Sequence, residues 1–245
     1  MAGKVLSYAW YIPPKPSGAG REAAGEIPRL LLFMALKTNV YVDAFNFYYG
    51  CIRKTPYHWL DLAQLCRLLL PAPKNEIHRI RYFTALVTPR RGDPQQRLRQ
   101  DMYLRALRTI PTITIHTGSF LASKPWMRKA DGSGWVRVLK SEEKGSDVNL
   151  ASHLLIDAYR SDFDVAAIIS NDSDLVFPIE HIKRHLGKII GIINPHKMPS
   201  RELFPLANFY KQIRPKVLAA SQFPDMMNDA LGEFHKPEHW CPPPA

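Results

Sequence analysis

Residues 165–174 read Val165-Ala166-Ala167-Ile168-Ile169-Ser170-Asn171-Asp172-Ser173-Asp174, an apolar run that ends abruptly in polar and acidic residues. Such a short run, bounded by turn-forming residues, is typical of a strand buried on both faces. The stretches 38–43 and 188–194 have the same character, and helical patterns lie between them. Strands that alternate with helices predict βαβ units, and therefore an α/β fold with a mostly parallel central sheet covered on both faces.

The rest of the chain extends this pattern. We expect strands at 38–43, 77–87, 112–116, 164–170 and 188–194, a shorter one at 135–139, and helices at 58–70, 93–109, 146–159 and 173–186. Asp93 and Pro94 would supply the N-cap and the first-turn proline of the second helix. Residues 120–134 look like a loop or hairpin insertion. These elements predict one domain at 37–213, with an N-terminal extension at 1–36 and a C-terminal tail at 214–245.

Composition narrows the choice of partners and compartment. The chain has 245 residues, a net charge of +11 and a pI of about 9.6. Residues 73–140 hold 14 Lys or Arg against four acids, which accounts for nearly the whole positive charge excess of the chain. This excess favours a polyanionic partner. An odd count of three cysteines without a CxxC pair predicts no disulfide framework and fits a reducing, cytoplasmic compartment. The apolar run 30–36 is too short to span a bilayer, so we expect no membrane partner.

Acidic residues follow or begin several of the predicted elements. Asp43 ends the run Val40-Tyr41-Val42, Asp147 begins the helix at 146–159, and Asp172 and Asp174 follow the strand at 164–170. Ligands of open parallel sheets bind beyond the carboxyl ends of the strands, so Asp43 and Asp172 should project from one edge. Two unit charges ~4 Å apart repel by about 4 kcal/mol at an effective dielectric of roughly 20. Such a cluster requires a cation or partial protonation.

Three blocks that contain these acids resemble a known family. They are Val40-Tyr41-Val42-Asp43-Ala44-Phe45-Asn46, Glu143-Lys144-Gly145-Ser146-Asp147-Val148 and Ile169-Ser170-Asn171-Asp172-Ser173-Asp174-Leu175. In this order they are similar to the signature blocks of NYN domains, a branch of the PIN-like nucleases. Ala44 and Asn171 stand where the family usually has Gly, and neither change removes a carboxylate.

The resemblance implies a PIN-like three-layer α/β/α sandwich that binds Mg²⁺ or Mn²⁺ and cleaves RNA. It also implies that Asp43, Asp147, Asp172 and Asp174 are the catalytic, metal-binding acids and that Asn46 lines the site. We expect Asp43 and Asp172 to contact the metal directly, and Asp147 and Asp174 to bind a second ion or to act through water. Hard divalent cations prefer carboxylate oxygens and activate water for in-line attack on a phosphodiester, which would leave 5′-phosphate and 3′-hydroxyl ends.

Other interpretations compete with this one. Each acid could instead cap a helix or form a turn. The fold could serve a catalytically weak RNA-binding or regulatory protein. A phosphatase of the haloacid dehalogenase type would need a second Asp two residues after Asp43, where Phe45 stands. A nucleotide-binding protein would need a phosphate-binding glycine loop after a strand, and the sequence has none. Glu142 and Glu143 are interpreted as solvated loop charges.

The basic segment is the predicted RNA-binding surface. RNA, either single-stranded or structured, would contact Arg and Lys side chains through its phosphates and aromatic side chains through unpaired bases. The expected contacts are Arg90, Arg91, Arg97, Lys124, Arg128 and Lys129, with Tyr103, Trp126 and Trp135 as candidate stacking partners. His181 and His185 have metal-pair spacing without further ligands, and His235, His239 and Cys241 form an incomplete zinc set. A homodimer is one of the assemblies that the sequence leaves open.

Overall fold

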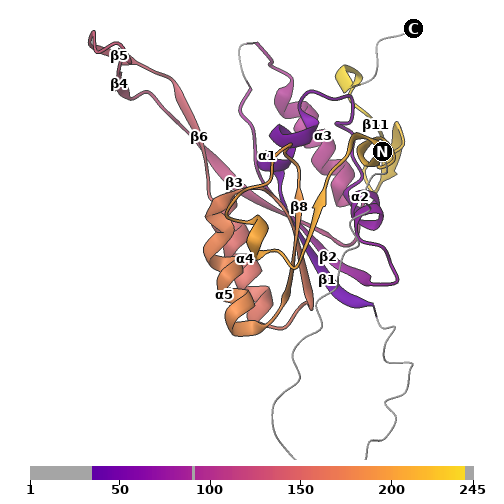
Figure 1. The fold of residues 1–245 in the computed structure, drawn as a ribbon. Helices are drawn as coiled ribbons and strands as arrows, with labels where there is room; N and C mark the ends of the chain where they lie inside the picture. Colours follow the sequence, from indigo (N-terminus) through magenta and orange to yellow (C-terminus); the bar gives the residue numbers. More distant parts are fainter. Residues whose placement is uncertain (1–34, 90–91, 241–245) are drawn as a thin grey trace, which may run out of the picture.

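The computed structural model describes residues 35–89 and 92–240, and it has one large sheet with helices on both faces (Figure 1). The sheet contains seven strands: β1 (Leu36–Asp43), β2 (Asn75–Ala85), β3 (Ile113–Ser123), β6 (Lys140–Lys144), β7 (Val165–Ile169), β8 (Ile189–Asn194) and β9 (Phe209–Gln212). Their spatial order is β6-β3-β2-β1-β7-β8-β9, and every neighbouring pair except β3–β6 is parallel. The predicted α/β class with a mostly parallel sheet is confirmed.

The order of the strands reverses between β1 and β7. From β1 the chain proceeds outward through β2 and β3, and from β7 it proceeds outward on the other side through β8 and β9. Val42 of β1 lies opposite Ile169 of β7 in a parallel register. The carboxyl ends of these two strands are therefore adjacent, which is where ligands bind in open α/β sheets.

Two hydrophobic layers enclose the sheet. On one face α2 (Leu62–Leu69), α3 (Gln96–Arg108), the short helix α1 (Ala44–Phe47) and α6 (Pro215–Ala219) pack against Val40 and Val42. On the other face α4 (Ser146–Tyr159) and α5 (Val176–Leu186) pack against Tyr41. Successive residues of β1 thus face opposite layers, as the pleat of a strand requires. Burial of both faces explains why β1, β7 and β8 have continuous apolar sequences.

Several boundaries differ from those predicted. The helix expected at 93–109 begins at Gln96, and the Asp93-Pro94 cap is wrong because the Asp93 carboxylate pairs with Arg99 instead. Asp61 caps α2 by accepting a hydrogen bond from the backbone N–H of Gln64 at 3.0 Å, so this helix begins later than residue 58. The helix expected at 173–186 divides into the 3-10 turn η3 (Ser173–Leu175) and α5. A π-helical turn, η2 (Tyr48–Ile52), follows α1.

A long β-arm extends from the sheet (Figure 1). The strand expected at 112–116 continues to Ser123 and pairs with β6 in antiparallel register from Ser119↔Lys144 to Ser123↔Lys140. Beyond that pair, β4 (Trp126–Arg128) and β5 (Trp135–Arg137) form a terminal hairpin, and Pro125 O accepts a hydrogen bond from Val138 N at 3.0 Å between the two parts. The insertion predicted at 120–134 is therefore part of an ordered hairpin.

The segment after residue 214 packs on the domain. It contains α6, the hairpin of β10 (Met226–Asp229) and β11 (Gly232–His235), and the 3-10 turn η5 (Glu238–Trp240); a further turn, η4 (Phe204–Leu206), precedes β9. Phe223 and Phe234 are buried in the hydrophobic core with Trp59, whose indole N–H donates to Pro224 O at 2.8 Å. The boundary at residue 214 remains a prediction, although this segment contributes to the core. Within 35–89 and 92–240, no helix is both long and apolar enough to cross a membrane.

A buried ion pair joins α4 to the sheet. Arg81 donates from Nε and Nη2 to the two carboxylate oxygens of Asp157 at 2.7 and 2.8 Å, and the Tyr41 hydroxyl donates to the same carboxylate at 2.8 Å. Removing one partner of a buried pair leaves an uncompensated charge, which typically costs about 3–5 kcal/mol.

We expect Arg81→Met to lower the free energy of unfolding by about 3–5 kcal/mol in urea titrations, because Asp157 would remain buried without its cation. Arg97→Met is the matched control. Arg97 forms an exposed pair with Asp101 one helical turn away, so its loss should cost less than about 1 kcal/mol. Equal losses for the two variants would contradict the importance assigned to the buried pair.

Candidate metal centre

Three aspartates meet at the carboxyl end of the central strands. Asp43 is the last residue of β1, Asp147 lies in the first turn of α4, and Asp172 follows β7. One carboxylate oxygen from each lies within 4.8 Å of the other two. In the part of the chain that the structure describes, this is the one group of three or more potential metal ligands. The predicted convergence of Asp43 and Asp172 at a single edge is confirmed.

Ser170 fixes two of the acids relative to each other. Its hydroxyl donates to Asp43 Oδ2 at 3.0 Å and accepts from the backbone N–H of Asp172 at 3.1 Å. Asp43 Oδ1 also accepts from the backbone N–H of Asn46 at 3.0 Å, so Asp43 caps α1. Asp172 likewise caps η3. Capping and membership of the cluster are therefore compatible roles, and each cap holds a carboxylate in place.

Asp147 is placed by the junction between the arm and α4. Gly145 adopts a φ of 99°, and the Glu143 carboxylate accepts from the backbone N–H of Ser146 at 3.0 Å, which caps the helix. A Cβ atom on Gly118 would lie 2.6 Å from both Glu143 Oε1 and Lys144 O. Only glycine at this position therefore lets β3 lie so close to the end of β6. Glu143 lines the cavity beside the aspartates, and it lies in strand β6 instead of the loop that was expected; it is outside the group of three potential metal ligands.

Asn46 connects three loops around the cluster. Its side-chain oxygen accepts from the backbone N–H of Asn171 at 3.0 Å and lies 3.0 Å from His196 Nε2. The loops after β1, β7 and β8 are thereby held together. Asn46 lines the cavity as expected, whereas Ser170 and His196 were not predicted. Ser170 directly follows β7 and His196 lies two residues after β8, and these positions at the ends of buried strands are the signal that could have identified them.

The electrostatics of the cluster favour a counter-ion. Burial raises the pKa of Asp43, and the charge of Asp172 adds to this effect, while hydrogen bonds from Asn46 and Ser170 oppose it. The pKa of Asp147 is raised to about 6, first by loss of water around its carboxylate and then by the charges of Asp43, Asp172 and Glu143. A proton or a cation relieves the same repulsion.

Asp174 differs from the other three acids. Its side chain is exposed, and its backbone N–H donates to Asp172 Oδ1 at 3.0 Å. Asp174 is outside the group of three acids whose carboxylate oxygens lie within 4.8 Å of one another. Its influence on the cluster is electrostatic, because its charge contributes to the raised pKa of Asp147. A role for Asp174 at a second ion or through water stays a prediction.

A cavity of about 570 Å³ opens beside the acids. Its wall contains Asp43, Asp147, Asp172 and Glu143 together with Arg99 and a set of aromatic rings, namely Phe45, Tyr48, Tyr49, His58, Tyr82, Tyr103, Phe120 and Trp240. His58 and Trp240 are stacked with their centroids 5.4 Å apart. The cavity therefore combines a charged end, suited to a cation and phosphate, with walls suited to planar rings.

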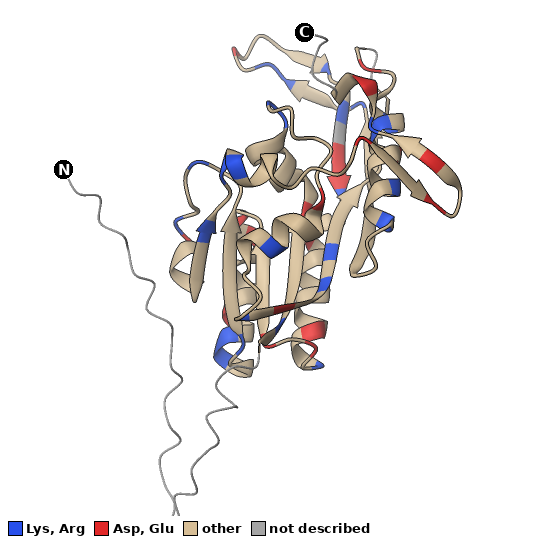
Figure 2. Ribbon diagram, turned by 90° about the vertical axis from the view of Figure 1, so that its right-hand side faces the viewer, with Lys and Arg blue, Asp and Glu red and all other residues tan. Residues whose placement is uncertain are grey.

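Among the described residues, the basic side chains predicted to contact RNA are divided between α3 and the β-arm. Arg97 pairs with Asp101 on α3, and Lys124, Arg128 and Lys129 are exposed on the arm. Other cations of the segment are also paired: Arg81 with Asp157, Arg99 with Asp93, and Arg105 with Asp229. In the view of Figure 2, Lys and Arg are interspersed with Asp and Glu. Arg90 and Arg91 lie outside the described residues, so their predicted contacts stay predictions.

The remaining candidates have ordinary contacts. Tyr103 is half-buried against the core, and its hydroxyl donates to Leu60 O at 3.0 Å. His181 lies 2.5 Å from the Tyr159 hydroxyl, measured from Nε2, and its ring is 4.5 Å from that of His185. His235 pairs with Glu233 at 2.9 Å, and Cys241 lies outside the described residues. Neither histidine set belongs to a cluster of three ligands among the residues described.

The donor atoms of the cluster fit a hard divalent cation. Mg²⁺ and Mn²⁺ prefer oxygen ligands, and Mg²⁺ commonly binds through one or two carboxylates while keeping several waters. The three carboxylates come from three separate elements, and hydrogen bonds fix Asp43 and Asp172. The residues present therefore match the kind of ion that the sequence predicted, and they do not distinguish Mg²⁺ from Mn²⁺.

Known proteins are similar to this chain in sequence and in fold. The chain is 30% identical over 238 residues to 6-hydroxy-3-succinoylpyridine 3-monooxygenase HspA of Pseudomonas putida, a match that covers 84% of this chain and 75% of that protein. A crystal structure of a protein of unknown function from Vibrio parahaemolyticus superposes with a TM-score of 0.51 at 19% identity, covering 77% of this chain and 97% of that one. It supports the fold alone. The sequence pattern of the NYN domain matches residues 37–211, and the chain therefore belongs to the NYN domain family, with its PIN-like nuclease fold.

Proposed function

We propose that this protein is a divalent-metal-dependent ribonuclease that hydrolyses RNA phosphodiester bonds. The observation that carries the proposal is the meeting of three carboxylates, with oxygens within 4.8 Å of one another, at the reversal of strand order in an NYN domain. Bringing these charges together is unfavourable unless a cation offsets them. The fold nevertheless fixes Asp43 and Asp172 with specific hydrogen bonds.

The chain's own groups supply the arrangement for this reaction. Asp43, Asp147 and Asp172 would hold the ion, which when bound supplies an activated water and offsets the negative charge of the phosphate. Ser170 and the backbone N–H of Asn46 keep Asp43 oriented. Arg99 and its partner Asp93 both line the cavity, so a phosphate would have to compete with the Asp93 carboxylate for the Arg99 guanidinium. The aromatic walls would contact the bases of the RNA on either side of the reacting bond.

Asp172→Asn tests this proposal. We expect a loss of at least about 100-fold in cleavage of a mixed RNA pool with Mg²⁺ or Mn²⁺, because one charged ligand is removed while the cap at η3 is retained. Circular dichroism should show an unchanged fold, and a chelator should abolish wild-type cleavage. Asp101→Asn is the control for loss of an acid elsewhere, and Asp174→Asn should have a smaller effect than Asp172→Asn.

Two outcomes would contradict the ribonuclease proposal. If Asp172→Asn cleaved RNA as fast as wild type, the acidic cluster would have no part in the reaction. If wild type bound RNA but cleaved none when Mn²⁺ was supplied, the alternative of a catalytically weak RNA-binding protein would replace it.

The relative from Pseudomonas putida supports a second candidate function. Its name states a monooxygenase acting on a pyridine, and its match covers more of the chain than the 175 residues of the NYN match. The rings in the cavity wall, including Tyr48, Tyr49 and the stacked His58–Trp240 pair, suit a small planar substrate. Such a reaction inserts one atom of dioxygen into the substrate and reduces the other to water with two electrons from an added reductant.

We expect no dioxygen consumption that depends on 6-hydroxy-3-succinoylpyridine, either with reduced pyridine nucleotide and flavin or with added Fe²⁺. For iron, the physical reason is that the described cluster has three carboxylates, whereas non-haem iron oxygenases use two histidines and one carboxylate. An oxygen electrode and chromatography of the product provide the measurement. Substrate-dependent oxygen uptake with formation of a hydroxylated product would favour the second candidate over the first.

The raised pKa of Asp147 predicts a pH dependence of stability in the metal-free protein. An acid whose folded-state pKa exceeds its unfolded value stabilises the fold below pH ~4, and this contribution is lost as the pH rises through about 6. In chelator, Asp147→Asn should therefore be more stable than wild type at pH 7.5, by about 1 kcal/mol after allowance for solvent screening.

Thermal unfolding across pH 4–8 provides the measurement for both proteins. The difference between them should shrink as the pH falls toward 4, where the Asp147 carboxyl is protonated in the folded state and about half protonated in the unfolded state. Added Mn²⁺ should stabilise wild type more than Asp147→Asn at pH 7.5. A variant less stable than wild type in chelator at pH 7.5 would show that the described repulsion is absent.

A further inference from the structure

The tip of the β-arm carries two chemically different faces. In the antiparallel β4–β5 hairpin, Trp126 lies opposite Arg137 and Arg128 lies opposite Trp135, while Met127 lies opposite Val136. Side chains alternate between the two faces of a strand, and directly opposed residues share a face. Trp126, Arg128, Trp135 and Arg137 therefore form one face, which we call the Trp–Arg face. Met127 and Val136 form the other.

The Trp–Arg face is open to solvent. Trp126 and Trp135 have 64% and 65% of their surface exposed, and both arginines are exposed as well. Two large aromatic rings exposed together on one face are typical of an interaction surface. Figure 1 shows the hairpin of β4 and β5 standing away from the rest of the domain. The arm thus presents two indole rings and two guanidinium groups together.

The charge of the tip identifies the class of partner. Between residues 124 and 140 the basic residues are Lys124, Arg128, Lys129, Arg137 and Lys140, and the one acid is Asp131. Asp131 accepts a hydrogen bond from the backbone N–H of Ser133 at 2.9 Å. A positive surface with exposed aromatic rings matches single-stranded nucleic acid, whose phosphates pair with cations and whose unpaired bases stack on rings. Contact between the arms of two copies would instead bring like charges together.

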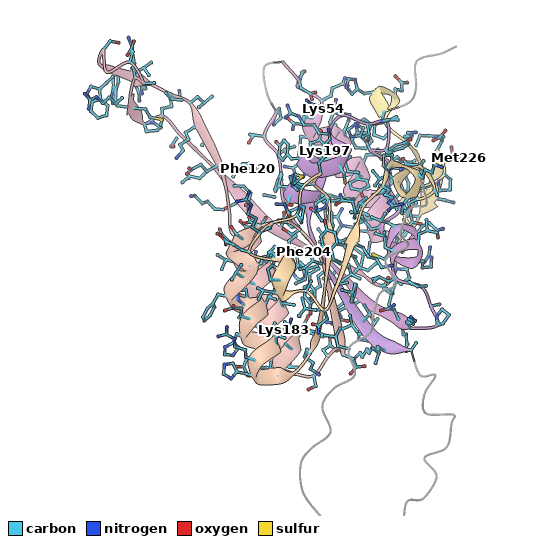
Figure 3. All side chains as sticks on the ribbon, viewed as in Figure 1. Lys54, Phe120, Lys183, Lys197, Phe204 and Met226 are labelled. Atoms are coloured by element: carbon cyan, nitrogen blue, oxygen red, sulfur yellow. The ribbon has the colours of Figure 1, made fainter. Side chains whose placement is uncertain are left out.

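The arm begins at the cavity. Phe120 of β3 and Glu143 of β6 are directly opposed in the ladder, and both line the cavity. Phe120 also packs edge-to-face on Phe45 with a centroid distance of 5.7 Å, and Figure 3 shows it where the arm leaves the body. From Phe120 to Trp126 the strand direction covers roughly 20 Å at about 3.3 Å per residue. About six stacked nucleotides, at roughly 3.4 Å each, span that distance.

We propose that the Trp–Arg face of the β-arm binds unpaired nucleotides of an RNA whose reacting phosphate lies at the acidic cluster. This inference rests on the proposed ribonuclease function and adds a second, outer contact to it. Trp126 and Trp135 stack on bases, and Arg128 and Arg137 contact the phosphates between them. RNA longer than about six nucleotides reaches both the cavity and the tip, whereas shorter RNA reaches only one of them.

Binding of fluorescein-labelled, unstructured RNAs of 4 and 20 nucleotides, measured by anisotropy in chelator, tests the proposal without requiring cleavage. Trp126→Ala/Trp135→Ala should weaken binding of the 20-nucleotide RNA by roughly 5- to 100-fold for each base that can no longer stack on an indole ring. Met127→Ala/Val136→Ala alters the opposite face of the same hairpin and should change the affinity less than twofold. Arg128→Gln/Arg137→Gln should lower the salt dependence of binding by about 0.7 in log–log slope for each phosphate that is no longer neutralised.

Failure of the arm proposal can be distinguished from failure of the ribonuclease proposal. Equal binding of the 20-nucleotide RNA by wild type and by Trp126→Ala/Trp135→Ala would overturn the proposal, even if cleavage is observed. A protein that cleaves no RNA but shows this weakened binding would retain the arm proposal while the nuclease proposal fails. If the tryptophan variant changed the sedimentation coefficient from dimer to monomer and left RNA binding intact, the face would instead contact a second copy of the chain, which also overturns the proposal.

Discussion

Electrostatic repulsion among carboxylates is the constraint around which this domain is organised. The strand order proceeds outward from β1 on one side and from β7 on the other, so the carboxyl ends of these two strands are adjacent. This brings Asp43 and Asp172 together, and the first turn of α4 adds Asp147. Hydrogen bonds from Ser170 and the Asn46 backbone hold Asp43 in place, and the Glu143 cap fixes the start of the helix that carries Asp147. The stability that holds the acids together comes from elsewhere, chiefly from the two apolar layers on the sheet.

The sequence predicted the centre of the fold well, because buried parallel strands have a simple signature. Continuous apolar runs located β1, β7 and β8, and the acids that follow the first two could be placed at one edge by topology alone. The start of α3 was not predictable in the same way. Asp93-Pro94 has the composition of a helix start, but a tertiary ion pair with Arg99 uses the carboxylate instead of a cap. Local propensity cannot anticipate such competition.

The charge composition of the sequence was the poorest guide to the surface of the folded protein. The excess of Lys and Arg in residues 73–140 suggested one continuous surface, yet Arg81 is buried against Asp157 and Arg105 is bound to Asp229 far along the sequence. Partners separated by 76 and 124 positions cannot be paired from composition. Glu143 was missed for a related reason. Its neighbour Glu142 does pair with lysines at the surface, while the alternation of β6 turns Glu143 toward the cavity.

The contacts of Trp59 have a consequence for the order in which the domain is made. Its ring packs with Phe223 and Phe234, which a ribosome adds more than 160 residues later. The central strands and the acidic cluster are synthesised well before that, so a nascent chain contains the three aspartates while one side of its core still lacks Phe223 and Phe234. Exposed apolar surface of this kind attracts chaperones and promotes misassembly. Closure of the core around Trp59 therefore has to wait for the synthesis of Phe223 and Phe234.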